Sequence, residues 1–326
     1  MLIADIGGTN LRVAILRDAQ SQPDYLPVAR VADHDGLEGA LKALLDDSPY
    51  RDVQGAMLAF AGPVDGATFR LTNNPWVVDP AALRRALGLR EVMVVNDFEA
   101  EALALPGLMP EHLMAIGGGA PVPDDARLVL GPGTGLGAAG LVRSSAGWCP
   151  VAGEAGHISL GPEGAEELKL WPHIEPVEGR ITAETVLSGS GIMRLYRAYA
   201  ALEGKDPVHA TPPEVTKAAE AGDPLAARAL TRLAVLLGRV AGDLALIYLA
   251  RGGVYLTGGV VENAERWLTT GGFRAAFEDK APHGAIMARI PTQIIKHPYP
   301  ALLGLAAFAR APGVFALDCD RRRFRV

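Results

Sequence analysis

Two glycine-rich segments carry residue types that can hold phosphate. The first, Asp5-Ile-Gly-Gly-Thr-Asn-Leu-Arg12, places a carboxylate at the end of an apolar strand, then two glycines and three hydrogen-bond donors. Glycines let backbone N–H groups approach an anion, and Thr, Asn and Arg side chains donate to phosphate oxygens. A carboxylate beside such a loop can hold Mg²⁺ through water. A plain hairpin turn would explain the glycines but not the polar residues around them.

The second segment, Gly131-Pro-Gly-Thr-Gly-Leu-Gly137, has Thr134 at its tip. Gly135, Gly137 and Gly140 satisfy the dinucleotide pattern G-x-G-x-x-G, but that pattern must open a helix, whereas 138–142 is typical of a strand. A Walker A loop is also absent from the sequence, since its one Gly-Lys pair is followed by Asp206. The segment therefore predicts a second anion-binding hairpin.

Asn96 and Asp97 follow the apolar strand 92–95 and precede a helical segment. Strand ends are where α/β proteins place reactive groups, because the sheet holds them rigidly. The alternative is that Asp97 is only a helix N-cap, and its position alone favours that. Together with the two phosphate loops, a catalytic Asp97 is the better interpretation.

Glu154 lies between Gly153 and Gly156, and His157 directly follows Gly156. On a helix this spacing would suggest metal ligands, but the glycines disfavour a helix. A loop with a carboxylate and an imidazole suits sugar hydroxyls, which both donate and accept hydrogen bonds. A structural buried histidine is the alternative. Glu184 precedes a predicted helix and is either a first-turn charge or another sugar acceptor.

The sequence leaves two alternatives for the role of each of two further segments. Asn73 and Asn74, before Pro75 and Trp76, form either a surface turn or a sugar contact. The pair Gly258-Gly259 ends the strand expected at 254–257. It either lets a flat purine or ribose approach or is only a turn.

The elements that must position these loops alternate along the chain. We expect strands at 2–6, 12–16, 55–62, 92–95, 128–130, 138–142 and 254–257, and helices at 37–46, 81–87, 190–203, 213–221, 224–250 and 262–269. Residues 2–16 and 128–142 repeat one arrangement, a strand, a glycine and threonine turn, and a strand.

The composition of the 326 residues, 49% hydrophobic and 21% charged, predicts two domains of an ordinary globular protein. A net charge of -6 disfavours nucleic-acid binding, and the basic cluster at 321–325 is expected to be a solvated end. Only two cysteines, Cys149 and Cys319, are present, which predicts a reducing, cytoplasmic location and no disulfide scaffold. No signal peptide is visible, and charges at 239 and 243 make 233–250 a buried helix rather than a membrane span.

The motifs occur in one order: Asp-Ile-Gly-Gly-Thr-Asn, Leu-Thr-Asn-x-x-Trp, Asn-Asp-Phe, Gly-Pro-Gly-Thr-Gly-Leu-Gly, Gly-Glu-x-Gly-His, Glu-x-Val-Leu-Ser-Gly and Thr-Gly-Gly. Each is modest, but seven in this order resemble the bacterial glucokinases of the proteobacterial type. The resemblance runs from Leu2 to about Phe308. It implies ATP-dependent phosphorylation of glucose to glucose 6-phosphate, which feeds glycolysis.

The resemblance also implies the two-domain actin-like ATPase (ribonuclease H-like) fold of the hexokinase type. A small α/β domain would comprise 1–105, completed by 300–326 with a C-terminal helix at 301–309. A large α/β domain would comprise 106–299. The active site would lie in the cleft between them, and the domains would close over ATP and sugar.

Residue roles carried over by motif agree with those argued from chemistry. Asp97 would be the general base, and Asp5 would hold Mg²⁺ through water. Glucose would be held by Asn73, Asn96, Glu154, His157 and Glu184. ATP would be held by Ala4, Asp5, Ile6, Gly7, Gly8, Thr9, Asn10, Arg12, Gly133, Thr134, Gly135, Gly258 and Gly259. The partners are thus glucose and ATP, with neither nucleic acid nor membrane, and a homodimer is left open.

Two alternatives are a kinase of another hexose, such as fructose or an N-acetylhexosamine, and a non-catalytic sugar-binding regulator. The first would share every phosphate motif. The second would need a DNA-binding element, and no helix-turn-helix precedes Asp5. The related repressor, open-reading-frame and kinase family has a Cys-rich zinc motif after its Gly-His segment, and this sequence has none, so structural zinc is not expected.

Overall fold

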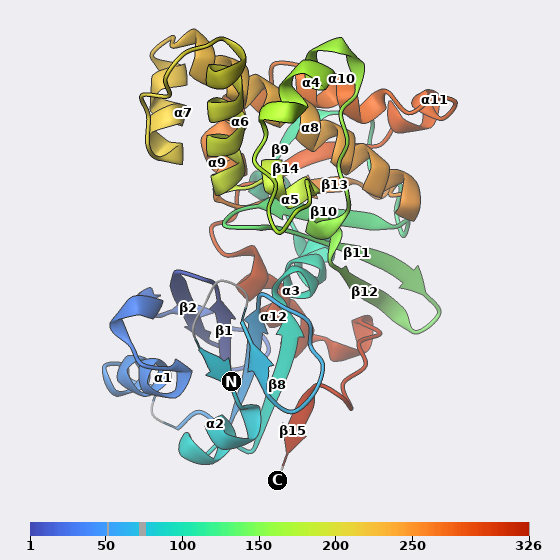
Figure 1. Ribbon diagram of the computed structural model, residues 1–326. Coiled ribbons are helices and arrows are strands. Elements are labelled where there is room, and N and C mark those ends of the chain that lie inside the picture. Colours follow the sequence, from blue (N-terminus) through green and yellow to red (C-terminus); the bar gives the residue numbers. More distant parts are fainter. Residues whose placement is uncertain (51, 72–75, 326) are drawn as a thin grey trace. The chain divides into compact units, whose positions relative to one another are not determined.

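The computed structural model describes residues 1–50, 52–71 and 76–325 (Figure 1). The chain divides into two compact units. Unit 1 comprises Met1–Met109, Ala139–Ala152 and His297–Val326, and unit 2 comprises Pro110–Ala138 and Gly153–Lys296. The expected division at 105 and 300 differs from this one mainly in residues 139–152, which the sequence assigned to the large domain.

Contacts with the C-terminal segment explain why 139–152 belongs to unit 1. Trp148 forms a β-bridge with Phe315, and its carbonyl oxygen accepts a hydrogen bond from the N–H of Ala316 at 2.8 Å. Gly147 has φ +126°, and a Cβ there would lie 2.4 Å from the carbonyl oxygen of Val314. These contacts join segments far apart in sequence, so no local pattern predicts them.

Unit 1 is built on a sheet with strand order β15-β8-β5-β1-β2-β3, in which β4 also pairs with β2. Strand β1 is antiparallel to β2 and parallel to β5, which is parallel to β8. The strands are β1 (Leu2–Ile6), β2 (Asn10–Ile15), β3 (Asp24–Tyr25), β4 (Ala29–Arg30), β5 (Gly55–Phe60), β8 (Glu91–Asn96) and β15 (Arg323–Arg325), with a separate pair β6 (Phe69–Arg70) and β7 (Val77–Val78). The central strand β5 is buried throughout, which fits its continuous apolar sequence.

The second sheet has the order β12-β11-β10-β13-β14-β9. Its strands are β9 (Leu113–Gly117), β10 (Arg127–Pro132), β11 (Leu136–Ser144), β12 (Gly147–Gly153), β13 (Val254–Leu256) and β14 (Thr292–Ile295). The hairpin strand β10 is followed by two parallel strands, β13 and β14, and by an antiparallel edge strand, β9. The first sheet shows the same succession from β1 through β5 and β8 to β15. The repeat predicted from two short segments therefore extends to the topology of both sheets.

Helices flank both sheets. Unit 1 contains α1 (Leu37–Asp46), α2 (Pro80–Ala86), α3 (Asp97–Ala104) and α12 (Pro300–Arg310), with 3₁₀ turns at Val31–Asp33, Leu105–Gly107 and Pro312–Val314. Unit 2 contains α4 (Gly164–Leu170), α5 (Ala183–Val186), α6 (Gly189–Leu202), α7 (Pro212–Glu220), α8 (Pro224–Tyr248), α9 (Gly259–Leu268), α10 (Gly272–Glu278) and α11 (Gly284–Met287), with 3₁₀ turns at Pro110–His112, Ala155–His157 and Trp171–His173. The helix expected at 262–269 begins earlier, at Gly259.

Helices α3 and α12 lie side by side in unit 1 (Figure 1). Their backbones approach so closely at Gly304 that a Cβ there would lie 1.7 Å from the carbonyl oxygen of Ala100. Position 304 therefore has to be glycine. This close packing fixes α3, the helix that begins with Asp97.

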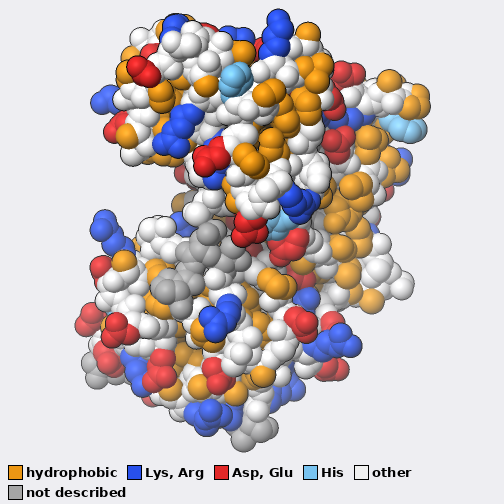
Figure 2. Space-filling view, viewed as in Figure 1, with side chains coloured by type: hydrophobic (Ala, Val, Ile, Leu, Met, Phe, Trp, Pro, Cys, Tyr) orange, Lys and Arg blue, Asp and Glu red, His pale blue; other side chains and the backbone are white. Residues whose placement is uncertain are grey.

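The long apolar helix α8 carries a charge that the core neutralises. Arg239, 6% exposed, donates from Nη1 to Oε2 of Glu167 at 2.8 Å, and Glu167 is 3% exposed. Paired burial of this kind removes most of the penalty for placing a charge in the core. None of the helices in the described part of the chain is long and apolar enough to cross a lipid bilayer. On the face shown in Figure 2, acidic and basic side chains are interspersed rather than gathered by sign.

Candidate active site

The first loop is a hairpin turn between β1 and β2, as predicted. Asp5, the last residue but one of β1, lies opposite Arg12, whose Nη1 donates to Oδ2 of Asp5 at 3.0 Å. The N–H of Gly7 donates to the carbonyl of Asn10 at 3.0 Å and closes the turn. Thr9 is exposed at the tip. The loop therefore presents polar groups beside a carboxylate that a guanidinium already orients.

Not every residue assigned to this loop has a side chain that reaches its surface. Ala4 and Ile6 are fully buried in the core of β1, so either could meet a nucleotide only through its backbone. Gly7, Gly8 and Asn10 are partly exposed. The exposed chemistry is thus concentrated in 7–12.

The helix cap beside Asp97 belongs to Asn96. Its Oδ1 accepts from the N–H groups of Phe98 at 2.9 Å and Glu99 at 3.2 Å, and Oε2 of Glu99 accepts from the N–H of Asn96 at 3.1 Å. This is a reciprocal capping box. The alternative that Asp97 is merely the N-cap is therefore wrong. Asp97 is the first residue of α3, and its Oδ1 accepts from the N–H of Phe98 at 3.0 Å.

Asn96 was predicted to bind sugar, and its amide already has structural contacts. Besides capping α3, its Nδ2 donates to the carbonyl of Gly62 at 3.2 Å. Each amide nitrogen has two hydrogens, so one remains for a ligand. Asn96 therefore joins the end of β5 to α3 and so fixes the position of Asp97.

Glu101, which the sequence analysis did not select, lies one turn after Asp97 on α3. Its Oε2 is buried and has no hydrogen-bond partner. Burial raises the pKa of Glu101 well above its ordinary value, and the charges of Asp97 and Asp5 raise it further, while Arg12 opposes them. Its i, i+4 spacing from Asp97 on the expected helix was the available signal.

Asp5 belongs to the same electrostatic cluster. Burial raises the pKa of Asp5, and the charge and hydrogen bond of Arg12 partly offset that rise. The charges of Asp97 and Asp5 thus both act on Glu101, and the Arg12 guanidinium opposes them. Within the described residues, no three His, Cys, Asp or Glu side chains are grouped closely enough to hold a metal directly.

The second loop connects β10 to β11. The N–H of Gly133 donates to the carbonyl of Gly135 at 2.7 Å, and Thr134 is exposed at the tip. A strand follows the loop, which confirms that Gly135, Gly137 and Gly140 are not a dinucleotide fingerprint.

Glu184 is the second residue of α5, after the N-cap Thr182. Its Oε2 accepts a hydrogen bond from the backbone N–H of Leu136 at 2.8 Å. The carboxylate therefore contacts the second loop directly. Neither alternative considered for Glu184, a first-turn charge or a sugar acceptor, anticipated this contact between residues distant in sequence.

Glu154 precedes the 3₁₀ turn Ala155–His157 and His157 ends it, so no α-helix forms here, as the glycines predicted. Their Oε2 and Nε2 atoms are 3.8 Å apart, and the side chains are 61% and 55% exposed. The alternative of a buried structural histidine is therefore excluded. Gly156 packs against the second loop, because a Cβ there would lie 2.3 Å from the carbonyl oxygen of Leu136.

The segments bearing His157 and Glu184 are joined. Ser159 and Thr182 form an antiparallel β-bridge. Arg180 donates from Nη2 to the carbonyl of His157 at 3.2 Å and to Oγ of Ser159 at 3.0 Å. Unit 2 thus brings Glu154, His157, Glu184 and the second loop into one connected set.

The glycine pair after β13 lies at the second loop. Gly258 has φ +93°, and a Cβ there would lie 2.8 Å from the carbonyl oxygen of Pro132. Gly259 begins α9. Asn73 lies outside the described residues, and nearby Trp76 is buried, with its indole N–H donating to the carbonyl of His34 at 3.2 Å.

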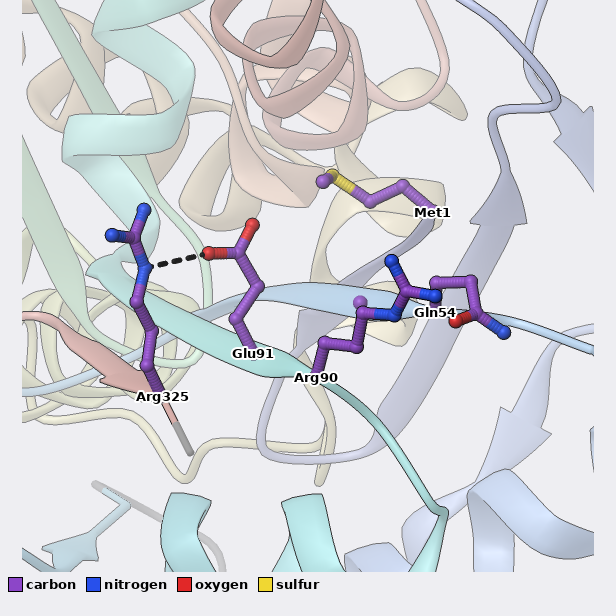
Figure 3. Close-up of a pocket in the computed structure, with 6 residues that line it drawn as sticks. Met1, Gln54, Arg90, Glu91 and Arg325 are labelled. Atoms are coloured by element: carbon purple, nitrogen blue, oxygen red, sulfur yellow. Dashed lines mark hydrogen bonds and ion pairs between the residues drawn. The ribbon is translucent and has the colours of Figure 1, made fainter.

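A cavity of about 520 Å³ lies elsewhere in unit 1 (Figure 3). It includes Gly55 and Glu91, the first residues of β5 and β8, whereas Asn96 ends β8 at the opposite edge. Oε2 of Glu91 accepts from Nε of Arg325 at 3.1 Å. The cavity is lined by Met1, Gln54, Gly55, Arg90, Glu91 and Arg325. It is distinct from the site assembled around Asp5 and Asp97.

Comparison with known proteins decides the family. The family model for glucokinase matches residues 2–312. A glucokinase of Mesorhizobium japonicum is 49% identical over 327 residues, which cover all of this chain and 96% of that protein. The chain belongs to the glucokinase family. A glucokinase of Brucella suis biovar 1 is 46% identical over 330 residues, covering all of this chain and 95% of the relative.

Solved structures agree with this glucokinase-family assignment. A glucokinase from an Antarctic psychrotroph superposes with a TM-score of 0.82 at 32% identity, covering 94% of this chain and 97% of that one. A ROK family glucokinase from Streptomyces griseus, solved with glucose and AMPPNP, has a TM-score of 0.66 at 22% identity, covering 95% and 98%. The latter likeness concerns the fold alone. The actin-like ATPase fold of the hexokinase type, predicted from the sequence, is confirmed.

Proposed function

We propose that this chain transfers the terminal phosphoryl group of ATP to the 6-hydroxyl of glucose. The full-length similarity to glucokinases carries the proposal. The structure supports it with a carboxylate, Asp97, that heads a helix capped by another residue. This glucose kinase activity would supply glucose 6-phosphate to glycolysis.

Asp97 acts as the general base in this mechanism. As the sugar oxygen bonds to the terminal phosphorus, the bond from that phosphorus to the bridging oxygen of ADP breaks, and the hydroxyl proton passes to Asp97. Most of the rate enhancement comes from positioning and from stabilising charge on the phosphoryl oxygens. The two glycine loops are the proposed donors of that stabilisation.

Sugar recognition is assigned to carboxylates that accept hydrogen bonds and to amide and imidazole groups that can also donate them. Protein groups that hydrogen-bond to substrate hydroxyls discriminate strongly between polar ligands. The proposed set is Asn73, Asn96, Glu154, His157 and Glu184. Asp97 and the first loop belong to unit 1, while Glu154, His157 and Glu184 belong to unit 2, so the proposed site draws on residues of both units.

Mg²⁺ fits the residues around the first loop. Glu101 has an orphaned carboxyl oxygen, and its charge interacts with those of Asp5 and Asp97. Asp5 would hold the ion through water. When bound, Mg²⁺ neutralises charge on the ATP phosphates and lowers the cost of transfer. We also propose a cytoplasmic location, supported by free thiols at Cys149 and Cys319.

Coupled measurement of ADP release tests the proposal. With Mg²⁺ and ATP, we expect the highest kcat/KM with glucose in a panel that includes fructose, mannose and N-acetylglucosamine. A higher kcat/KM with another sugar would assign the enzyme to that hexose. Glucose binding without sugar-dependent ADP release would favour the non-catalytic regulator instead.

A further inference from the structure

Glu184 holds the base of the second glycine loop. The 2.8 Å hydrogen bond from the N–H of Leu136 to its Oε2 is charge-assisted, and such bonds are stronger than neutral ones. On the other side of the loop, the N–H of Gly189 donates to the carbonyl of Gly133 at 2.8 Å. The segment that contains Glu184 and the start of α6 therefore fastens both ends of the loop.

Gly135 makes room for this contact. A Cβ at position 135 would lie 2.4 Å from Oε2 of Glu184 and 3.1 Å from its carboxyl carbon. At Gly161, which belongs to unit 2 and to no proposed binding set, a Cβ would meet no atom within 4 Å. Neither glycine has a positive φ, so alanine at either position does not strain the backbone. The two positions therefore form a matched pair of test sites.

Leu136 also contacts the proposed sugar-binding segment. Its N–H is held by Glu184, and its carbonyl oxygen packs against Gly156, between Glu154 and His157. The β-bridge between Ser159 and Thr182 joins the segment that contains Gly156 to the segment that contains Glu184. Leu136, in the second glycine loop, thus contacts both Glu184 and the turn that carries Glu154 and His157.

We infer that Glu184 is a positioning residue that couples glucose binding to ATP binding through its hydrogen bond to Leu136. The inference rests on the proposed function, in which the same carboxylate accepts a sugar hydroxyl. A carboxylate has about four acceptor positions on its two oxygens, so both contacts fit one side chain. Sugar that immobilises Glu184 also immobilises the N–H of Leu136 and reduces the ordering needed when phosphate binds. By linkage, ATP strengthens glucose binding by the same factor.

The test measures this factor by calorimetry on the full chain. We compare the dissociation constant of a non-hydrolysable ATP analogue with Mg²⁺, without glucose and with saturating glucose. For the wild-type protein, we expect glucose to tighten binding about 5-fold or more, as is usual for coupled sites. Gly135→Ala, which displaces Glu184, should bring the factor close to one. Gly161→Ala adds the same methyl group in unit 2 without touching Glu184 or the second loop, and it should keep the wild-type factor.

Melting temperatures of the variants separate coupling from a general structural effect. The inference is overturned if Gly135→Ala melts like the wild type and keeps the full factor, or if the wild type shows no coupling. If Gly135→Ala does not fold, Glu184→Gln takes its place. Its neutral amide oxygen accepts a weaker hydrogen bond from Leu136, so an unchanged factor again overturns the inference. Failure of the proposed function can be told apart from failure of this inference. In that case the wild type would bind no glucose or release no ADP.

Discussion

Asp97 combines a reactive carboxylate with a fixed backbone. Asn96 supplies the helix cap, and Asp97→Asn preserves the size of the side chain and an acceptor for the N–H of Phe98. The amide cannot take the hydroxyl proton. We therefore expect kcat to fall by ~10²–10⁴-fold, the usual worth of general-base assistance. Steady-state kinetics and a melting curve of the same preparation check this.

The control for Asp97→Asn is its stability. Its melting temperature should stay near that of the wild type, since the capping box does not use Asp97. ATP affinity should also persist, because both glycine loops are intact. Wild-type turnover in a well-folded Asp97→Asn protein would eliminate the general-base role.

Glu101 predicts a pH dependence of stability. In the unfolded chain, its carboxyl ionises near the ordinary pKa of about 4.3. In the fold, burial and the nearby Asp97 and Asp5 raise the pKa, so the folded state retains the proton to higher pH. The fold therefore loses stability as pH rises from the ordinary pKa towards the raised one. Glu101→Gln removes this loss and should raise the melting temperature more at pH 8 than at pH 5.

The Glu101→Gln comparison is made in EDTA, so that bound cations do not contribute. Glu38→Gln is a suitable control, since Glu38 is an exposed residue whose partner is Lys42 on the same helix. Exposed pairs of this kind contribute little to stability. A melting-temperature difference for Glu101→Gln that is the same at both pH values would show that ionisation of Glu101 does not oppose folding.

At the scale of elements, the sequence predicted best what is encoded locally. The amphipathic segment at 37–46 and the apolar strand from Gly55 match α1 and β5. Strands β9, β12 and β14 were not anticipated, because their short sequences show no strong alternation of apolar and polar residues. The alternative that made Asp97 the helix cap was off by one residue, since Asn and Asp cap equally well and Asn96 is the cap.

The packing of α12 on α3 makes Gly304 a sensitive position. In Gly304→Ala, the new Cβ would collide with the carbonyl oxygen of Ala100, so the helices must separate. Overpacking typically costs about 1–3 kcal/mol, and backbone collisions lie at the upper end. We expect a lower melting temperature and, because α3 carries Asp97, a lower kcat. Thermal unfolding and steady-state assays measure both.

Gly313→Ala is the matched control for Gly304→Ala. Gly313 also lies in the C-terminal part of unit 1, but a Cβ there would meet no atom within 4 Å. Its melting temperature should remain close to that of the wild type. Equal destabilisation by the two substitutions would mean that the contact with Ala100 is not the cause.

At the scale of the whole molecule, local sequence predicted the two phosphate loops but not how distant segments meet. Motif order and glycine spacing placed Thr9 and Thr134 at the tips of hairpins. The contact of Glu184 with Leu136 spans segments with no shared pattern, and only the folded chain reveals it. The same holds for Trp148 and Phe315, whose bridge assigns 139–152 to unit 1.

At the scale of the whole protein, the residues that could bind a metal predict a requirement for Mg²⁺ and none for structural zinc. The two cysteines, Cys149 and Cys319, are both free, and the described part of the chain has no cluster of three metal-ligating side chains. Structural zinc sites need such a cluster, whereas Mg²⁺ enters kinase sites with the substrate phosphates. We expect EDTA to abolish turnover and Mg²⁺ to restore it, while a zinc-selective chelator changes neither kcat nor the melting temperature. Metal analysis of the active protein accompanies these assays, and stoichiometric zinc whose removal unfolds the chain would contradict the prediction.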